Sequence, residues 1–336
     1  MTNTGNRVIG FDFLRAISML YIIGIWHLSD YVNHIFTSPI TNIFTLCALS
    51  IFVYISGFLL TSKYGSVNTI KDLNTFLIKR LFRIYPLYLS ALVLFFLTGL
   101  ITYMKAFVAA IFFMDVILNI PITTLWFISM IFVYYLLIPI ISYHYSKKKS
   151  LLIVALFIAF CAAIHIRFNR IDMSLISFFP SFILGFFSAR HSVIIRLFKS
   201  KTFAIASLLY IAATIYLSYT IESAWAKEVL RFVVAPSSIS PLIVFSELLA
   251  SKTDLGIIRK LSYASFCMYL YHRVVYCLIL RIYHPETNIL TILYLMCIGL
   301  PSIYFISKLV QSKYDCFLEW VFQSGSMRFH SSKRGS

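Results

Sequence analysis

Charged residues are scarce in this sequence of 336 residues. Asp, Glu, Lys and Arg make up 12% of it, against roughly 25% in a typical soluble protein. Apolar residues make up 60%, and no stretch has the composition of a soluble domain or of a low-complexity chain. The deficit of charge excludes a soluble protein. It predicts an all-α fold, a polytopic bundle of transmembrane helices.

Acidic residues are the scarcest of the charged residues. The chain has 12 Asp and Glu against 29 Lys and Arg, which gives a net charge of +17. The basic residues lie in short connections between apolar runs, the pattern of loops retained on the cytoplasmic side of a membrane. Membrane lipids are therefore the expected surroundings, with anionic headgroups or a phosphate ligand as secondary possibilities. Nucleic acid is not an expected partner.

Several chemical motifs are absent as well. The 6 cysteines show no CxxC spacing and fall almost all in apolar runs, so neither a disulfide framework nor a metal site is expected. No P-loop, GxSxG, HExxH or dinucleotide-binding glycine pattern occurs in a fitting context. A catalytic function would therefore have to come from the few polar residues in the apolar runs.

The apolar runs predict the membrane topology. A span needs about 20 mostly apolar residues, and the candidate runs are 11–31, 42–62, 84–103, 106–119, 125–145, 150–166, 174–190, 202–220, 230–250, 262–283 and 288–310. The run 106–119 is short. If it does not cross, all the basic clusters share one side, as the positive-inside rule requires. We therefore expect about ten spans with both termini cytoplasmic, and residues 104–124 extracytoplasmic or re-entrant.

The division of the chain follows from this topology. Without an internal repeat, the spans are expected to form one integral-membrane domain, residues 1–312. Residues 313–336 are expected to form a short basic cytoplasmic tail.

The first span carries three ionisable side chains, which a hydrocarbon core disfavours. Asp12 and Arg15 are three residues apart and can pair on one helix face, and anchoring at the interface is the simpler interpretation of both. His27 lies about 18 Å further along the helix axis. It is either a histidine that bonds a neighbouring helix or a functional group.

A cluster of cations precedes the third span. Lys79, Arg80 and Arg83 lie at the start of a helix on the predicted cytoplasmic side. Their charge would simply retain the loop there. Two arginines three residues apart also suit bidentate binding of a phosphate group, and both interpretations stay open.

Two later spans begin or continue with aromatic and basic residues. Trp126 opens a span, the usual place of an interfacial tryptophan. Tyr263, Tyr269, His272 and Arg273 lie in or near a late span. We interpret these four as aromatic packing with an interfacial His–Arg pair.

Several stretches together resemble the acyltransferase-3 family of bacterial integral-membrane acyltransferases. Each is weak alone, but they cover most of the chain in the family's order and spacing. They are FDFLRAISMLYIIGIWH (11–27), SGFLLTSKY (56–64), FLIKRLFRIYPLYLSALV (76–93), LWFISMIFVYYLLIPII (125–141), FFPSFILGFFSAR (178–190) and LSYASFCMYLYH (261–272).

The resemblance implies a fold of about ten spans and a transfer of an acyl group, usually acetyl, from cytoplasmic acyl-CoA to a carbohydrate hydroxyl. The family's first-helix arginine and histidine fall on Arg15 and His27. Its Arg-x-x-Arg pair falls on Arg80 and Arg83, and its tryptophan on Trp126.

The spacing in the first helix departs from the family. Members usually have ten residues between the arginine and the histidine, whereas this chain has one more. At about 100° per residue, a regular helix would leave Arg15 and His27 about 120° apart. We therefore predict a π-bulge, or a distortion centred on Gly24, that restores one face. Many members also have an acidic residue where this chain has Ile131, so no carboxylate is assigned there.

The expected co-substrate is acetyl-CoA or another acyl-CoA, with no metal. Arg80 and Arg83, with Lys79 beside them, are expected to hold its phosphates, and Arg15 is a further candidate. The pantetheine arm would then run up the bundle toward the first-helix histidine.

The expected catalytic residues lie further into the membrane. His27 would act as general base toward the acceptor hydroxyl, and Asp12 would orient Arg15. Trp126 would stack on a sugar or close over the thioester. Direct transfer and an acyl-histidine intermediate both stay open.

The acceptor expected from the resemblance is a bacterial surface polysaccharide such as O-antigen or exopolysaccharide, or a lipid-linked precursor, and the expected location is the bacterial inner membrane. A transporter or flippase of an anionic or lipid-linked substrate is the alternative, and a structural subunit of a polysaccharide assembly complex is a third class. The sequence shows neither an internal repeat nor paired broken spans, which many transporters have, and this counts against a transporter. A structural subunit has no use for His27.

Overall fold

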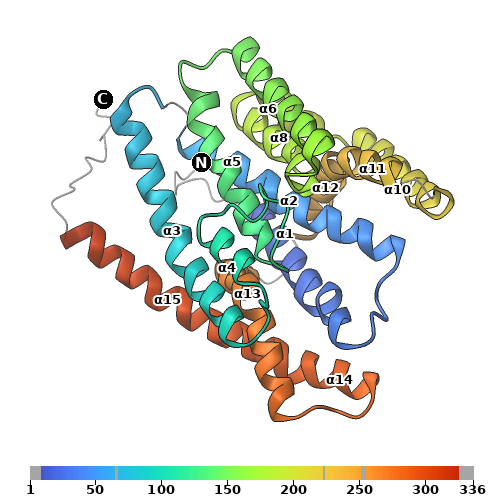
Figure 1. The fold of residues 1–336 in the computed structure, drawn as a ribbon. Helices are drawn as coiled ribbons and strands as arrows, with labels where there is room; N and C mark the ends of the chain where they lie inside the picture. The colour runs from blue at the N-terminus through green and yellow to red at the C-terminus, as the bar shows by residue number, and fades with distance from the viewer. Residues whose placement is uncertain (1–8, 65–66, 222–223, 251–254, 325–336) are drawn as a thin grey trace.

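The computed structural model describes residues 9–64, 67–221, 224–250 and 255–324. Within these ranges the regular elements are helices without a strand, and they form a single bundle (Figure 1). The all-α prediction is confirmed.

The helical elements are distributed along the whole described chain. The first half contains α1 (Ile9–Tyr21), η1 (Ile22–Trp26), η2 (Leu28–Tyr31), α2 (Pro39–Lys63), α3 (Ile70–Leu97), α4 (Met104–Ile111) and α5 (Trp126–Ser142). The second half contains α6 (Lys147–Phe168), α7 (Met173–Ser177), α8 (Phe179–Arg190), α9 (Ser192–Phe198), α10 (Lys201–Thr220), α11 (Ala224–Ser237), α12 (Ile239–Ala250), α13 (Leu255–Ile282), α14 (Asn288–Tyr294), η3 (Leu295–Gly299) and α15 (Leu300–Ser324).

The helices account for the predicted spans. In the described part of the chain, 9 helical segments are long and apolar enough to cross a membrane, and α5 is a shorter apolar helix. Together they correspond to the predicted crossing runs, so the polytopic fold is confirmed. The run 106–119 overlaps α4, a helix of only 8 residues that ends at Ile111 before the chain turns irregular, and such a helix is too short to cross. The cytoplasmic location of both termini stays a prediction.

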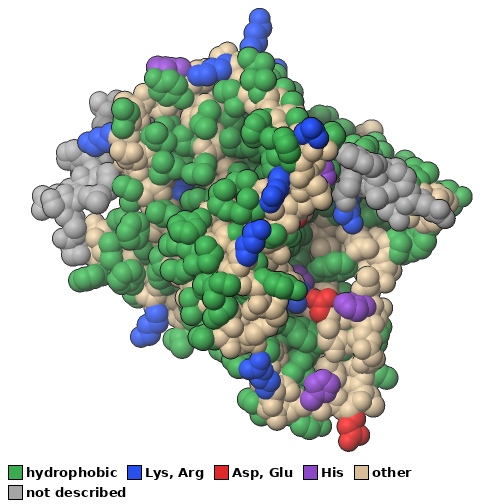
Figure 2. All heavy atoms as spheres, in the orientation of Figure 1, with side chains coloured by type: hydrophobic (Ala, Val, Ile, Leu, Met, Phe, Trp, Pro, Cys, Tyr) green, Lys and Arg blue, Asp and Glu red, His purple; other side chains and the backbone are tan. Residues whose placement is uncertain are grey.

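The outer surface of the bundle is apolar. Figure 2 shows hydrophobic side chains over much of the face in view. Helices α6 and α10 expose large apolar side chains such as Leu152, Phe160 and Leu209. Such a surface is unfavourable in water and matches the hydrocarbon of a bilayer.

Two glycines let α2 and α8 pack closely. A Cβ atom on Gly57 would lie 2.3 Å from the carbonyl oxygen of Phe182, and one on Gly185 would lie 2.2 Å from that of Tyr54. Small residues permit such backbone approach between membrane helices. Both glycines belong to stretches that carry the resemblance, so packing explains their place in the pattern.

Helix α1 lies in the middle of the bundle and contacts α2, α12 and α13. It therefore carries its polar residues into the protein interior rather than into lipid. At the other end of the chain, α15 continues past position 312 to Ser324 without a break. Residues 325–336, half of the predicted basic tail, lie outside the described residues, and the boundary at 312 stays a prediction.

Candidate active site

The first span departs from a regular α-helix just before His27. The backbone N–H of His27 donates to the carbonyl of Ile22, five residues earlier, at 2.8 Å. Residues Ile22–Trp26 form the π-helical turn η1 with Gly24 at its middle. The predicted bulge is confirmed. Because a π-turn absorbs one residue, the rotation between Arg15 and His27 falls from about 120° to about 20°.

His27 lines a cavity of about 520 Å³, called the histidine cavity below. Its volume is in the range of small-molecule sites. Polar and aromatic lining residues include Trp26, Asn42, Asn119, Trp126 and Asp172. The structure thus brings two residues of the sequence-predicted site, His27 and Trp126, to one cavity.

A second cavity of about 400 Å³ contains the predicted cationic residues. Its lining includes Asp12 and Arg15 from α1 and Arg80 and Arg83 from α3, so we call it the arginine cavity. These four polar residues come from two helices and line one cavity, and their roles stay predictions. Lys79 is not among the residues that line it. Apolar side chains, among them Met19, Phe127, Ile128 and Ile131, form much of the remaining wall.

Asp12 is held in place by α13. Its side chain is buried, and its Oδ1 accepts a hydrogen bond of 2.7 Å from the Ser262 hydroxyl. A buried carboxylate needs such donors. Orientation of Arg15 by Asp12 stays a prediction, although both residues line the same cavity.

The arginines of α3 are held by neighbouring helices. Arg83 donates to Asp315 of α15 at 2.8 Å, and Asp315 also accepts a bond of 2.6 Å from the Tyr263 hydroxyl. The Arg80 guanidinium lies 5.1 Å from the centre of the Tyr64 ring, within the range of a cation–π contact. The partial exposure of Arg83 (51%) leaves its ion pair accessible to water and to a competing anion.

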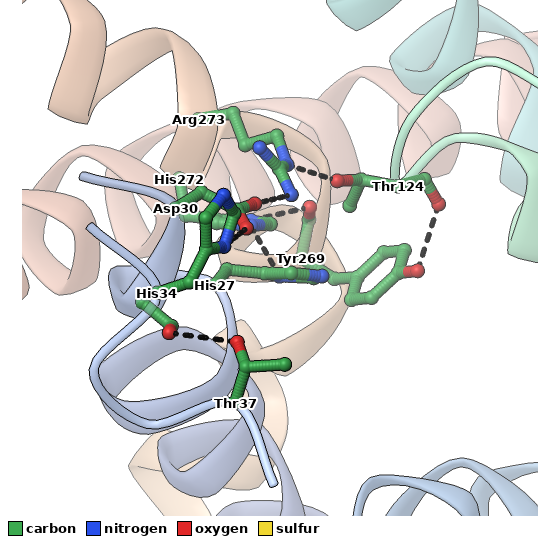
Figure 3. Close-up of polar contacts among 9 residues, drawn as sticks. His27, Asp30, His34, Thr37, Thr124, Tyr269, His272 and Arg273 are labelled. Atoms are coloured by element: carbon green, nitrogen blue, oxygen red, sulfur yellow. Dashed lines mark hydrogen bonds and ion pairs between the residues drawn. The ribbon is translucent and has the colours of Figure 1, made fainter. Parts of the chain in front are cut away.

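Tyr269 of α13 lines both cavities. Its hydroxyl donates to the carbonyl of Thr124 at 2.7 Å (Figure 3). Its ring centre lies 6.4 Å from that of His27 and 5.5 Å from that of Phe127. The Tyr269 side chain therefore stands between the arginine cavity and the histidine cavity.

His27 contacts a residue that the sequence-based interpretation placed at the interface. His272 is fully buried, and its Nε2 lies 2.8 Å from Nδ1 of His27 (Figure 3). The adjacent Arg273 is also buried and donates to Asp30 at 2.5 Å and to the Thr124 hydroxyl. His272 and Arg273 are thus buried in the protein and join His27 and Asp30 in one polar network. Their location at the membrane interface stays a prediction.

One signal in the sequence pointed to this network. Ionisable side chains within spans require partners inside the protein. His27 and Asp30 stand near the end of the predicted span 11–31, and His272 and Arg273 stand in the middle of the predicted span 262–283, so each pair could have served as the other's partner. Over the described residues, no group of three or more His, Cys, Asp or Glu is arranged to hold a metal ion.

Comparison with known proteins gives one match. A family model described as an acyltransferase domain matches residues 8–308, nearly the whole chain. No curated protein and no solved structure matches.

Proposed function

Since the chain belongs to the acyltransferase-3 family and is a membrane acyltransferase, we propose that it transfers an acyl group, preferably acetyl, from acyl-CoA to a carbohydrate hydroxyl. One observation carries the proposal. A cavity with three arginines and a cavity with His27 lie on opposite sides of Tyr269. One chamber suits a polyanionic donor, and the other, whose lining includes Asp172 and Arg231 beside His27, suits a hydroxyl-rich acceptor.

The donor would enter the arginine cavity. Arg80 and Arg83 offer planar, always-charged groups that suit the phosphates of CoA, and Arg15 lines the same cavity. Their place near the predicted cytoplasmic loops fits a cytoplasmic donor. The apolar walls beyond the arginines suit the pantetheine arm. Lys79, outside the cavity lining, would add only long-range attraction for the anionic donor.

The reaction would take place where the two cavities meet. His27 takes the proton of the acceptor hydroxyl as that oxygen attacks the thioester carbonyl carbon. The C–S bond then breaks, and the imidazolium returns its proton to the leaving thiolate. The products are an O-acyl ester and free CoA thiol. General-base catalysis of this kind contributes about 10² to 10⁴ in rate.

The acceptor would lie in the histidine cavity. Trp126 offers an aromatic face to the C–H groups of a sugar ring, and indole rings provide large apolar contact area. The Asn42 and Asn119 amides and the Asp172 carboxylate provide donors and acceptors for hydroxyl groups. We propose a surface polysaccharide unit, such as an O-antigen or exopolysaccharide repeat, as the acceptor, and the bacterial inner membrane as the location.

The test is transfer of labelled acetyl from acetyl-CoA to surface glycan in membranes that contain the protein. His27→Ala should abolish transfer, and Arg80→Ala/Arg83→Ala should raise the KM for acetyl-CoA. His284→Ala and Arg259→Ala/Lys260→Ala are matched controls outside both cavities and should behave as wild type. Full transfer by His27→Ala removes the proposed base. Absence of transfer by the wild type, with uptake of an anionic glycan precursor instead, supports a transporter.

A further inference from the structure

The ring of His272 has a defined hydrogen position. Its Nδ1 lies 2.8 Å from the carbonyl oxygen of Tyr269 and 3.2 Å from that of Met268, within its own helix. A carbonyl oxygen only accepts hydrogen bonds, so Nδ1 of His272 must carry the hydrogen. A second proton on Nε2 would bury a positive charge next to the Arg273 guanidinium, which is unfavourable. Nε2 of His272 is therefore a bare acceptor.

This acceptor fixes the tautomer of His27. Nε2 of His272 lies 2.8 Å from Nδ1 of His27, and the two rings are within 9° of parallel. Stacked rings are separated by more than that distance, so the rings must lie side by side, the arrangement of an N–H···N hydrogen bond. With a lone pair on the His272 side, Nδ1 of His27 must carry the hydrogen. Nε2 of His27 then holds the free lone pair.

We propose that His272 is a positioning residue that holds His27 in the tautomer with a basic Nε2. The inference rests on the proposed role of His27 as general base. A neutral imidazole thus takes the place that a carboxylate has in many nucleophile–base–acid arrangements. When His27 gains a proton at Nε2, its Nδ1–H bond to His272 becomes charge-assisted and strengthens.

The neighbouring ion pair keeps the two rings in register. Asp30 follows His27 by three residues, and Arg273 follows His272 directly, so the Asp30–Arg273 pair lies beside the histidine pair. Arg273 and Tyr269 also bond Thr124, which ties α13 to the residues before α5. The charged or titratable groups around the histidine pair are thus Arg273, its counter-ion Asp30 with His34 beside it, and, in the cavity that His27 lines, Asp172, His165 and Arg231. The Arg273 guanidinium disfavours a second positive charge on His272.

Histidine-selective ¹⁵N NMR of the purified full-length protein tests the tautomer without substrate. The signals of His27 are assigned by their loss in His27→Ala. We expect a protonated Nδ1 and an unprotonated Nε2. The reverse pattern overturns the proposal, whatever the activity of the protein, so its failure is distinct from failure of the proposed base.

Three substitutions at His272 test the catalytic consequence. His272→Gln keeps an acceptor oxygen toward His27 and should lose no more than about tenfold in kcat, whereas His272→Leu should lose about 10²-fold or more with an unchanged KM for acetyl-CoA. His272→Glu places a carboxylate there and should move the acid limb of the kcat/KM profile to higher pH. Equal losses in Gln and Leu variants of equal folded yield, with an unmoved limb for Glu, would reduce His272 to a packing residue and overturn the proposal.

Discussion

The backbone N–H of His27 bonds the carbonyl of Ile22, and this wide turn sets the direction of the imidazole. In a regular α-helix the same N–H would reach Ile23. The carbonyl of Ile23 instead lies 3.4 Å from the hydroxyl of Tyr276, which donates to it from α13. The helix that supplies His272 therefore also supports the bulge that presents His27.

The bulge predicts unequal effects of deletion and insertion in α1. Deletion of Ile25 should convert the wide turn to a regular turn and keep Arg15 and His27 on one face. Insertion of one alanine between Ile17 and Ser18 should rotate them apart by about 100° and abolish transfer. Acetyl transfer per amount of folded protein in membranes measures both. Equal loss in the two variants contradicts this account of the bulge.

The sequence predicts features that are repeated along the chain. Long apolar runs gave the spans, because burial in hydrocarbon demands them everywhere. The departure of one residue between Arg15 and His27 gave the bulge, because helical periodicity converts a spacing into a direction. Arg80 and Arg83 line one cavity for the same reason, because residues three apart share a helix face.

The sequence does not predict which helix faces which. His27 and His272 are far apart in the chain, and their contact depends on the packing of α1 against α13. Arg273 is buried and pairs with the exposed Asp30, which also follows from the packing of α1 against α13. Lys79 is next to Arg80 in the same turn of α3, yet it does not line the arginine cavity. Proximity in the sequence therefore did not predict which of these cations reach the cavity.

Asp315 predicts a change in donor affinity. Its carboxylate pairs with Arg83 at the arginine cavity and repels an incoming phosphate. Asp315→Asn should lower the KM for acetyl-CoA about threefold at low salt, and less at high salt, because a charge a few ångströms away is screened by ions. The exposed Glu286→Gln should leave the KM unchanged. An increase in KM for Asp315→Asn would mean that the carboxylate mainly orients Arg83.

Tyr269 predicts a change in the fate of the acyl group. Tyr269→Ala should open the wall between the cavities, so that water reaches the thioester and hydrolysis of acetyl-CoA rises relative to transfer. Tyr269→Phe retains the wall and loses only the hydrogen bond to Thr124. Its ratio of acetyl-CoA hydrolysis to acetyl transfer should therefore stay near that of the wild type. Tyr135→Ala, which enlarges the arginine cavity alone, is the matched control. Release of CoA with and without glycan acceptor gives the ratio.

The glycine contact between α2 and α8 predicts a stability effect. Gly185→Ala forces a Cβ atom against the Tyr54 carbonyl and should cost about 1–3 kcal/mol, the usual penalty of overpacking. Gly24→Ala meets only an ordinary contact of 3.6 Å with Met296 and should not destabilise the protein. The midpoint of thermal unfolding in detergent measures both. An unfolding midpoint of Gly185→Ala equal to that of the wild type would show that α2 and α8 can move apart without a loss of stability.

Asp115, between α4 and α5, predicts a dependence of stability on pH. The side chain is fully buried, and burial raises its pKa above the ordinary value, although the Ser129 hydroxyl opposes part of the rise. The folded state therefore keeps a proton that the unfolded state has already released at the same pH. Folding stability from this group then falls as pH rises from the unfolded pKa, about 3.9, toward the raised folded pKa, and stays low above it.

Asp115→Asn is neutral at every pH and removes this loss. Its unfolding midpoint should exceed that of wild type at pH 8, and the difference should shrink as pH is lowered toward 4. Glu286→Gln, at an exposed carboxylate, should show no such trend. A difference for Asp115→Asn that is constant from pH 4 to pH 8 would mean that the Asp115 carboxyl group keeps one protonation state throughout, against the effect of its burial.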